Sequence, residues 1–456
     1  MPGSFYGINL AARSLRAFQH GLDVTGHNIA NANTAGYTRQ ALDLNSLSGS
    51  RVYGVHPFSV GGGVDIGSVN RVRDQFLDAR RQSAESQLTK SDTLQTTVGA
   101  IQGVLNEPGA SGVSAALGKF FDAWSGLAGN ASDSGTRIQV QQAGQTLVSR
   151  IKDAFVQIEQ QASNNTGNVN LTLDRVDELA GQISTINVSI QEAFANGAMP
   201  NDLLDQRQQM INELDQLADV HTDDTANGGI LISIGGFSLV DGAGSHAVPR
   251  GFDPVTSRLI DSNGHTFQIS GGSLSAFMTS EAKIKDAMTQ LNTLANTLRT
   301  EVNTIHATGT NLLGGSGINF FNTGTGAGDL ALDDKILADP KAISAGATGK
   351  PGDGGLALSL SALRDTKVVA LGDRSFTTFY SEFASSVSRD VGFYKNLVDT
   401  QTAVVQQIDK QIESISGVSV DDEMADMLKL QRSYQAAAKT LSIFDQITED
   451  LINLVR

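Results

Sequence analysis

Apolar residues at heptad spacing run through the first thirty residues of the chain. Alternating steps of three and four separate Ile8, Ala11, Leu15, Phe18, Leu22, Thr25, Ile29 and Ala32. The stripe is narrow, like the seam of a coiled coil, and predicts an amphipathic helix. Asn residues and a Gly crowd the segment from Asn28 to Tyr37. Because these residue types favour helix ends and turns, they predict where the helix stops.

The end of the chain carries the same pattern. One heptad phase contains Val420, Met427, Leu430, Tyr434, Ala437, Leu441, Phe444, Leu451 and Val455, with Glu423 and Thr448 as polar interruptions. Asp421, Asp422 and Glu423 fall in the predicted first turn, where the helix dipole favours negative charge. The pattern predicts a second amphipathic helix.

Neither terminal helix can bury its stripe alone, and a short isolated helix is marginal in water. The two ends could pair with each other, pair with other copies of the chain, or belong to an ordinary intramolecular core. The pattern alone leaves these possibilities open. Under the pairing hypotheses, the predicted assembly interface consists of Ile8, Leu15, Phe18, Leu22, Ile29, Met427, Leu430, Tyr434, Leu441, Phe444 and Leu451.

Further elements are predicted between the ends. Helical periodicity covers about 71–105, 169–195, 200–217, 273–306 and 376–415. Asn187 occupies a core position of the second of these, where a polar residue can fix register. Strand alternation concentrates in 221–272, with one hairpin around Gly235-Gly236, another around 258–269, and a separate short strand at Leu330 to Leu332.

This order predicts an α+β fold with nested, discontinuous domains. A length of 456 residues suggests about three domains. We expect a terminal helical assembly domain formed as a coiled-coil pair by residues 1–60 and 417–456. An inner domain, a long-helix bundle with short β segments, would comprise 61–220 and 273–416, and a β-rich outer domain would comprise 221–272.

Composition narrows the possible partners. The net charge of −15 argues against nucleic acid and anionic membranes, which favour a basic face. The sequence has no stretch of ~20 apolar residues, so no transmembrane helix is predicted. Arg13 and Arg16 interrupt the apolar residues near the N-terminus, so no secretory signal peptide is predicted either. The absence of cysteine excludes disulfides and thiolate chemistry.

Residues that could carry chemistry are scattered. The seven His form no close pair or metal-binding motif, and neither Gly-Lys pair is followed by the Ser or Thr of a phosphate loop. The motif Gly324 to Asp329 occurs once, whereas calcium repeats need stacked copies, so it predicts a loop. Asp205 is expected to form a salt bridge to a neighbouring helix or to be solvated. We therefore predict no catalytic, metal or cofactor site, and no enzymatic activity.

Both ends resemble one protein family. The segments from Ser4 to Asn9 and from Gly21 to Gln40 are similar to the N-terminal signature of flagellar rod, hook and hook-associated proteins. The C-terminal segment from Asp422 to Lys439 resembles their shared C-terminal motif. Interior motifs similar to the hook-associated branch are Phe76-Leu-Asp-Ala-Arg80, Phe120-Phe-Asp-Ala-Trp124, Leu204-Asp-Gln-Arg207 and Ile318-Asn-Phe-Phe321.

The resemblance implies a structural subunit of the extracellular flagellum that joins hook to filament. Its implied partners are further copies of itself, hook protein, the second hook-filament junction protein and an export chaperone. It would leave the cell through the flagellar type III channel, with its terminal regions unstructured before assembly.

Two alternatives remain. Within the family, the chain could be a hook or rod protein. From another class, it could be a secreted adhesin or enzyme on a helical stalk, with 221–272 as the active module.

Overall fold

The computed structural model describes residues 5–48, 50–52, 58–107, 109, 112–253, 258–348, 350 and 352–455. The chain divides into two units, each assembled from separate stretches. Unit 1 comprises Met1–Ser86, Arg175–Val248 and Gln401–Arg456, and unit 2 comprises Gln87–Asp174 and Pro249–Thr400. The three-part division expected from the sequence stays a prediction.

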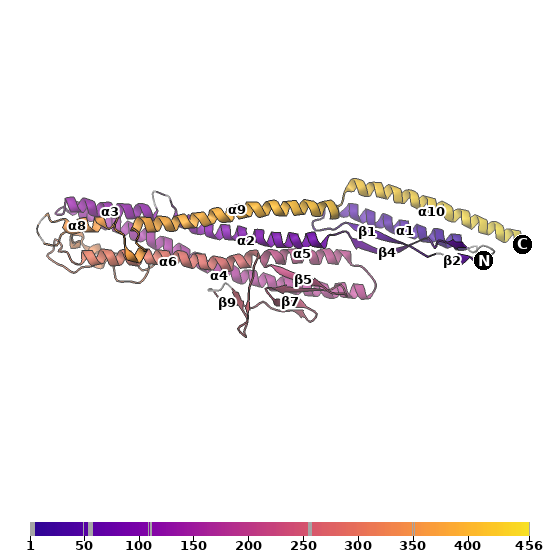
Figure 1. The fold of residues 1–456 in the computed structure, drawn as a ribbon, viewed down its shortest axis with the longest axis horizontal. Helices are drawn as coiled ribbons and strands as arrows, with labels where there is room; N and C mark the ends of the chain where they lie inside the picture. The colour runs from indigo at the N-terminus through magenta and orange to yellow at the C-terminus, as the bar shows by residue number, and fades with distance from the viewer. Residues whose placement is uncertain are drawn as a thin grey trace. The chain divides into compact units, whose positions relative to one another are not determined.

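Unit 1 combines both ends of the chain with small antiparallel sheets (Figure 1). Its elements are α1 (Phe5–Asn31), β1 (Gln40–Ser46), β2 (Ser50–Val52), β3 (Phe58–Val60), β4 (Val64–Arg71), α5 (Asn201–Leu217), β5 (Val220–Asp224), β6 (Ile230–Ile234), β7 (Phe237–Asp241), β8 (Gly244–Ser245) and α10 (Val420–Val455). Strands β1 and β4 form an antiparallel ribbon against which α1 packs. Strands β5 to β8 form a second antiparallel sheet, in chain order.

Unit 2 is mainly helical. Its elements are α3 (Val113–Gly129), β9 (Gly251–Asp253), β10 (Arg258–Ile260), β11 (Thr266–Phe267), α6 (Gly272–His306), α7 (Asp334–Ala338), η1 (Pro340–Ala342), α8 (Gly355–Ala362) and η2 (Val369–Leu371). Residues of α2 (Gln75–Leu105), α4 (Ser134–Ala195) and α9 (Phe376–Ser416) belong to both units. Long helices with small antiparallel sheets confirm the predicted α+β class.

The β5–β8 sheet of unit 1 shows the predicted alternation of buried and more exposed residues. Ile230, Ile232 and Ile234 of β6 are buried, and the turn to β7 passes through Gly235 at φ 55° and Gly236 at φ 90°. These left-handed conformations suit glycine, which has no Cβ to clash. Asn187 of α4 is buried as predicted, and its Nδ2 donates to the Ile230 carbonyl at 2.9 Å. This hydrogen bond joins the helix to the sheet.

The core of unit 2 is built on aromatic rings. Phe120, Phe121 and Trp124 of α3 are fully buried with Phe320 and Phe321. The ring centroids of Trp124 and Phe320 lie 5.2 Å apart in an edge-to-face arrangement, which is a geometry that aromatic pairs prefer. Two interior motifs of the sequence therefore meet as hydrophobic core, where burying each large side chain contributes roughly 1.5–3 kcal/mol.

Some predictions were incomplete or wrong. Helix α4 begins at Ser134 and has 62 residues, so the predicted 169–195 is its second part. Helix α3 and the β1–β4 ribbon were not predicted. The strand expected at Leu330 to Leu332 is absent from the described residues, where Leu332 makes an isolated bridge to Phe321.

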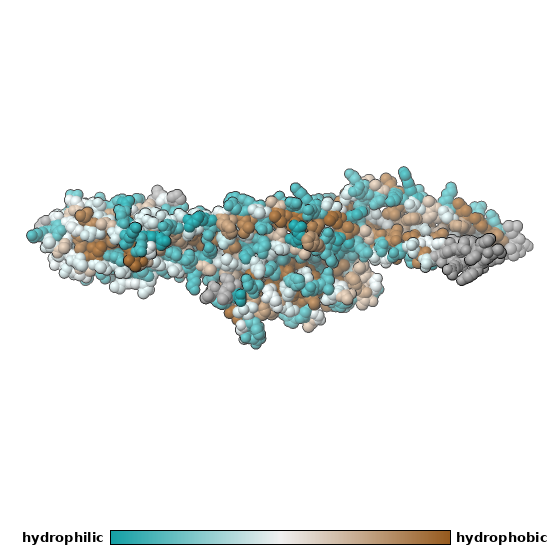
Figure 2. Space-filling view, viewed as in Figure 1, coloured by the Kyte–Doolittle hydropathy of each residue, from teal (hydrophilic) through white to brown (hydrophobic). Residues whose placement is uncertain are grey.

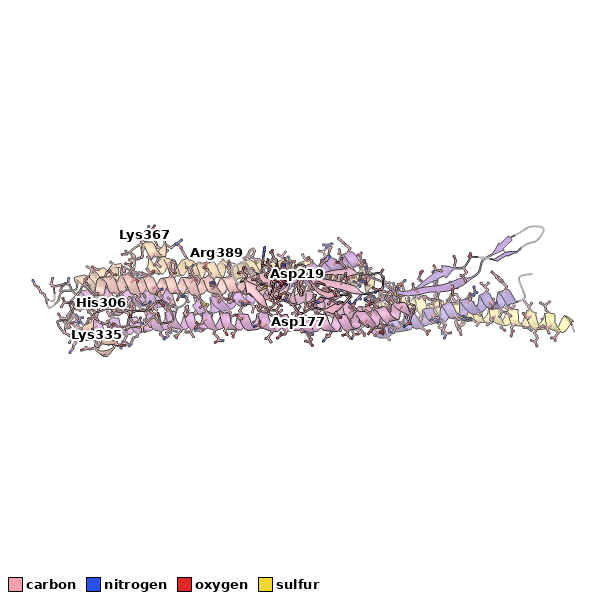
Figure 3. The ribbon with its side chains drawn as sticks, turned by 90° about the horizontal axis from the view of Figure 1, so that it is seen from below. Asp177, Asp219, His306, Lys335, Lys367 and Arg389 are labelled. Carbon is pink, nitrogen blue, oxygen red and sulfur yellow. The ribbon has the colours of Figure 1, made fainter. Side chains whose placement is uncertain are left out.

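A buried histidine joins two loops of unit 2. His306, at the end of α6 (Figure 3), is fully buried. Its Nδ1–H donates to the Ile318 carbonyl at 2.7 Å, and its Nε2 accepts from the Ser344 amide at 2.9 Å. This geometry requires a neutral ring. Burial lowers the pKa of His306 from 6.5 to about 4, with a smaller opposite effect from the Ile318 bond.

We expect unit 2 to be acid-sensitive through His306. A depressed histidine pKa means that the unfolded chain binds the proton first. The contribution of neutral His306 to the free energy of unfolding is therefore complete above pH 6.5, and it is lost as the pH falls towards 4. The loss is on the order of 3 kcal/mol, an upper bound from the size of the pKa shift.

Urea unfolding at several pH values measures this loss of stability. The single tryptophan, Trp124, serves as the fluorescent probe, because the centroid of its ring lies 6.0 Å from that of His306. In His306→Gln the free energy of unfolding should be lower at pH 7.5, and it should depend less on pH between 4 and 6.5. An unchanged pH dependence would contradict the assignment.

Candidate assembly site

The two terminal helices lie side by side in unit 1. Helix α1 packs along α10. A Cβ built on Gly7 would lie 2.6 Å from the Phe444 ring, and one built on Gly21 would lie 3.1 Å from the Leu430 side chain. Early residues of α1 therefore meet late residues of α10, so the pair is antiparallel. Of the arrangements left open by the sequence, the structure contains pairing of the ends with each other.

The predicted interface residues are covered to different degrees. Tyr434 and Leu451 are exposed, at 36 % and 48 %. The other nine are half-buried: Ile8, Leu15, Phe18, Leu22, Ile29, Met427, Leu430, Leu441 and Phe444. The most buried positions of α1 carry small or polar residues, namely Ala11, Ala17, Gly21, Thr25 and Asn28. The large apolar side chains thus keep part of their surface free, and their role in assembly stays a prediction.

A buried carboxylate ties the two helices together. Glu423, in the first turn of α10, is 2 % exposed. It accepts hydrogen bonds from Asn28 Nδ2 at 3.1 Å and from Arg39 Nε at 2.7 Å. From the sequence, Glu423 was an interruption of the heptad stripe and an acidic residue of the first turn, and its two partners were not predicted. Its partners are nearly 400 residues away, and a charged residue at a seam position was the signal that could have indicated them.

Asn28 also organises the segment that follows α1. Its Oδ1 accepts from the Gln40 amide at 2.9 Å, and its Nδ2 donates to the Gln40 carbonyl at 2.9 Å. The side chain thereby pairs with the backbone where β1 begins. The Tyr37 hydroxyl donates to the same Oδ1 at 2.7 Å, and burial raises the pKa of Tyr37. This tyrosine therefore stays protonated as a donor.

Asp205 holds the same segment from the side of α5. It is 6 % exposed and accepts from the Thr38 amide at 3.1 Å and the Thr38 hydroxyl at 2.9 Å. It also forms an ion pair with Arg71 at 2.9 Å. The sequence predicted a salt bridge from Asp205 to a neighbouring helix, or solvation. The salt bridge is present, but its partner Arg71 is the last residue of strand β4. These contacts of Asp205 hold the segment after α1, strand β4 and helix α5 together.

Arg207, from the same interior motif, anchors α5 to the sheet. Its Nη1 donates to Asn187 Oδ1 at 2.9 Å and to the Gly228 carbonyl at 2.8 Å. Burial lowers its pKa to about 10, so it remains charged at neutral pH. The motif therefore holds α4, α5 and the loop before β6 together.

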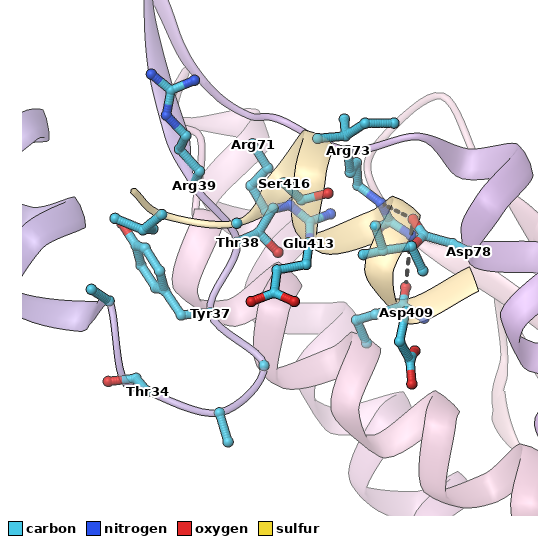
Figure 4. Close-up of a pocket in the computed structure, with 18 of the residues that line it drawn as sticks. Thr34, Tyr37, Thr38, Arg39, Arg71, Arg73, Asp78, Asp409, Glu413 and Ser416 are labelled. Carbon is cyan, nitrogen blue, oxygen red and sulfur yellow. Dashed lines mark hydrogen bonds and ion pairs between the residues drawn. The ribbon is translucent and has the colours of Figure 1, made fainter. Parts of the chain in front are cut away.

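A polar cleft of about 1480 Å³ lies beside the segment Ala32 to Arg39, opposite the end of α9 (Figure 4). The four arginines of its lining, Arg39, Arg71, Arg73 and Arg81, all form internal ion pairs. Arg73 pairs with Asp78 at 2.6 Å, and Arg81 pairs with Asp409 at 2.6 Å. This arrangement suits a structural joint better than a reactive site.

Comparisons with known proteins match the chain at both ends and in the middle. The profile described as "Flagella basal body rod protein" matches residues 8–38, and "Flagellar basal body rod FlgEFG protein C-terminal" matches 411–454. "Flagellar hook-associated protein FlgK helical domain" matches 98–321. The chain belongs to the flagellar rod, hook and hook-associated protein family. This is a family of structural proteins, not of enzymes.

Relatives within this family match the full length. Flagellar hook-associated protein 1 of Bacillus subtilis is 26 % identical and covers 99 % of both chains. The protein of the same name from Escherichia coli is 25 % identical over 98 % of this chain and 99 % of its own. The flagellar hook junction protein FlgK from Burkholderia pseudomallei shares the fold, with a TM-score of 0.66 and 16 % identity, over 74 % of this chain and all of its own.

In the described part of the chain, no three His, Asp or Glu side chains gather as metal ligands would. The loop Gly324 to Asp329 closes on itself, because Asp329 accepts from the Thr325 amide and pairs with Arg299 at 2.8 Å. None of the helices that the structure describes is both long and apolar enough to cross a membrane.

We expect Asp205→Ala to destabilise unit 1 strongly. The substitution leaves Arg71, whose side chain is 10 % exposed, without its carboxylate, and it removes the acceptor for Thr38. Breaking a buried pair in this way costs roughly 3–5 kcal/mol. Chemical unfolding measures the loss, with Gln206→Ala, at an exposed neighbouring position on α5, as the matched control. Equal effects of the two substitutions would contradict this role.

Proposed function

We propose that this chain is a hook-filament junction subunit that polymerises through its paired terminal helices. The observation that carries the proposal is the α1–α10 pair, whose large apolar residues are only partly covered within one chain. The name shared by its full-length relatives supports the place of the subunit in the flagellum. Because the profile of the hook-associated helical domain matches the interior, we favour this function over a rod or hook protein.

The exposed flanks of α10 support polymerisation. Met424 and Leu428 each follow a residue of the α1-facing stripe, whereas Ile443 and Ile447 each precede one. One residue turns an α-helix by about 100°, so the two pairs lie on opposite flanks. All four side chains are roughly half exposed. Figure 2 shows hydrophobic residues among hydrophilic ones on the surface of α10.

With an apolar flank on each side, α10 could contact two neighbouring subunits at once, one through each flank. A subunit that presents a different surface to each neighbour builds a ring or a helical array. Each flank would be covered by the α1–α10 pair of an adjacent copy. The half-buried residues of the α1–α10 seam would lose their remaining exposure in the same contacts.

The remaining partners follow from this proposal. Hook protein and the second hook-filament junction protein would lie on either side of the ring. An export chaperone would cover the apolar surface of α10 before assembly, and the subunit would reach the extracellular flagellum through the type III channel. The terminal assembly domain of residues 1–60 and 417–456 belongs to the same proposal.

A complementation experiment tests the function. In the source bacterium, deletion of the gene should leave hooks without filaments and release flagellin into the medium. Expression of the full chain should restore junctions in electron micrographs. Normal filaments in the deletion strain would overturn the junction role, and loss of the hook itself would favour a hook or rod protein.

Substitutions on α10 test the mechanism. Leu441→Asp in the seam and Ile447→Asp on a flank should both prevent filament attachment, because burying a charge in an apolar contact is costly. Gln446→Asp, at an exposed polar position of the same helix, is the matched control and should assemble normally.

Calorimetry of the isolated subunits separates assembly from folding. The main transition should be unchanged in all three variants. A large loss of monomer stability in Leu441→Asp would show that the seam is ordinary core, and normal junctions with Ile447→Asp would exclude the flank as a contact.

We also expect α1 and α10 to exchange amide hydrogens rapidly in the free subunit. Small residues fill the most buried positions of α1, so the pair buries little apolar area per turn. Hydrogen exchange followed by mass spectrometry should show weak protection in 1–60 and 417–456 and strong protection in the aromatic core of unit 2. Strong protection of both termini in the monomer would contradict coupling of their order to assembly.

A further inference from the structure

Three contacts between α1 and α10 share one register. Gly7 lies against Phe444, Gly21 lies against Leu430, and Asn28 bonds to Glu423. Fourteen residues separate the two glycines, and fourteen separate their two partners. Seven residues separate Gly21 from Asn28, and seven separate Glu423 from Leu430. The contacts therefore recur at whole heptads along both helices.

Apolar contacts at heptad spacing do not by themselves fix a register. A slip of one heptad would place Gly7 opposite Ala437 and Ser14 opposite Leu430. Both new pairs combine a small residue with an apolar one, as the native pairs do. The same slip would place Glu423 opposite Gly21, which has no side chain to donate a hydrogen bond.

We propose that the buried Asn28–Glu423 pair selects the register of the α1–α10 helix pair. A buried charge without a partner is heavily penalised, and a single polar residue in a seam can specify the alignment of two helices. Arg39 binds the same carboxylate, and Asn28 also holds Gln40 at the start of β1. The selected register is thereby joined to the rest of unit 1. It concerns one chain alone: a pair that opens often in the free subunit recloses in this register, and a disulfide traps the closed state.

The absence of cysteine makes the register directly measurable. Ser14 and Ala437 lie opposite each other in the native register, one heptad from the Gly7–Phe444 contact. We would compare the double variant Ser14→Cys/Ala437→Cys with Ser14→Cys/Leu430→Cys, which reports the slipped register. A slip of one heptad moves the helices by roughly 10 Å, whereas a disulfide needs Cα atoms within about 7 Å.

In the full-length chain under mild oxidation, the native-register pair should form its disulfide roughly tenfold faster than the slipped pair. Adding Asn28→Ala or Glu423→Ala should reduce this ratio to about twofold or less. Glu423→Gln keeps an oxygen acceptor for Asn28 and should retain most of the selectivity. Each cysteine pair is compared with itself across these backgrounds, so its own effect on packing cancels.

Asn31→Ala is the matched control, because that side chain is bonded to His27 and Thr34 of its own segment. It should leave the ratio unchanged. Equal rates for the two cysteine pairs without further substitution would overturn the proposal. So would a ratio that survives Asn28→Ala, because the connecting loops would then set the register.

Discussion

The buried carboxylate of Glu423 is the constraint on which the terminal part of this chain depends. A charge taken out of water must be paired, and its partners come from the other end of the chain, at Asn28 and Arg39. The first turn of α10 can be buried only where the last turn of α1 is also present. Two segments that are remote in sequence are therefore specified as neighbours by a single side chain.

Small residues give this pair its particular balance of specificity and strength. Gly7 and Gly21 let large side chains of α10 approach the backbone of α1 closely, but they contribute little area of their own. The stability gained per turn is modest, since it scales with the apolar area removed from water. Such a pair can have a defined geometry and still leave apolar surface for other contacts.

Much of this fold could be predicted from periodicity, because heptad stripes and strand alternation record which face of an element is covered. Both terminal helices, α5, α6, α9 and the β6–β7 hairpin were predicted in this way. The first part of α4 was missed although its buried positions, such as Val140, Leu147 and Ile151, keep heptad spacing, because Arg137 and Gly144 interrupt the apolar stripe. The β1–β4 ribbon was missed because most side chains of β1 are exposed and those of β4 are at most half-buried, so neither strand shows a clear apolar face.

The polar ties of unit 1 could not be predicted, since their partners are far apart in sequence and each residue is unremarkable alone. Unit 2 draws its stability from a dense core of buried aromatic and aliphatic side chains. Ion pairs such as Arg71–Asp205 add little net stability, yet a wrong arrangement that leaves one charge unpaired is expensive. Unit 1 thereby gains accuracy of geometry in preference to strength. A subunit that must repeat in identical contacts needs this accuracy, because apolar seams at heptad spacing would accept more than one alignment.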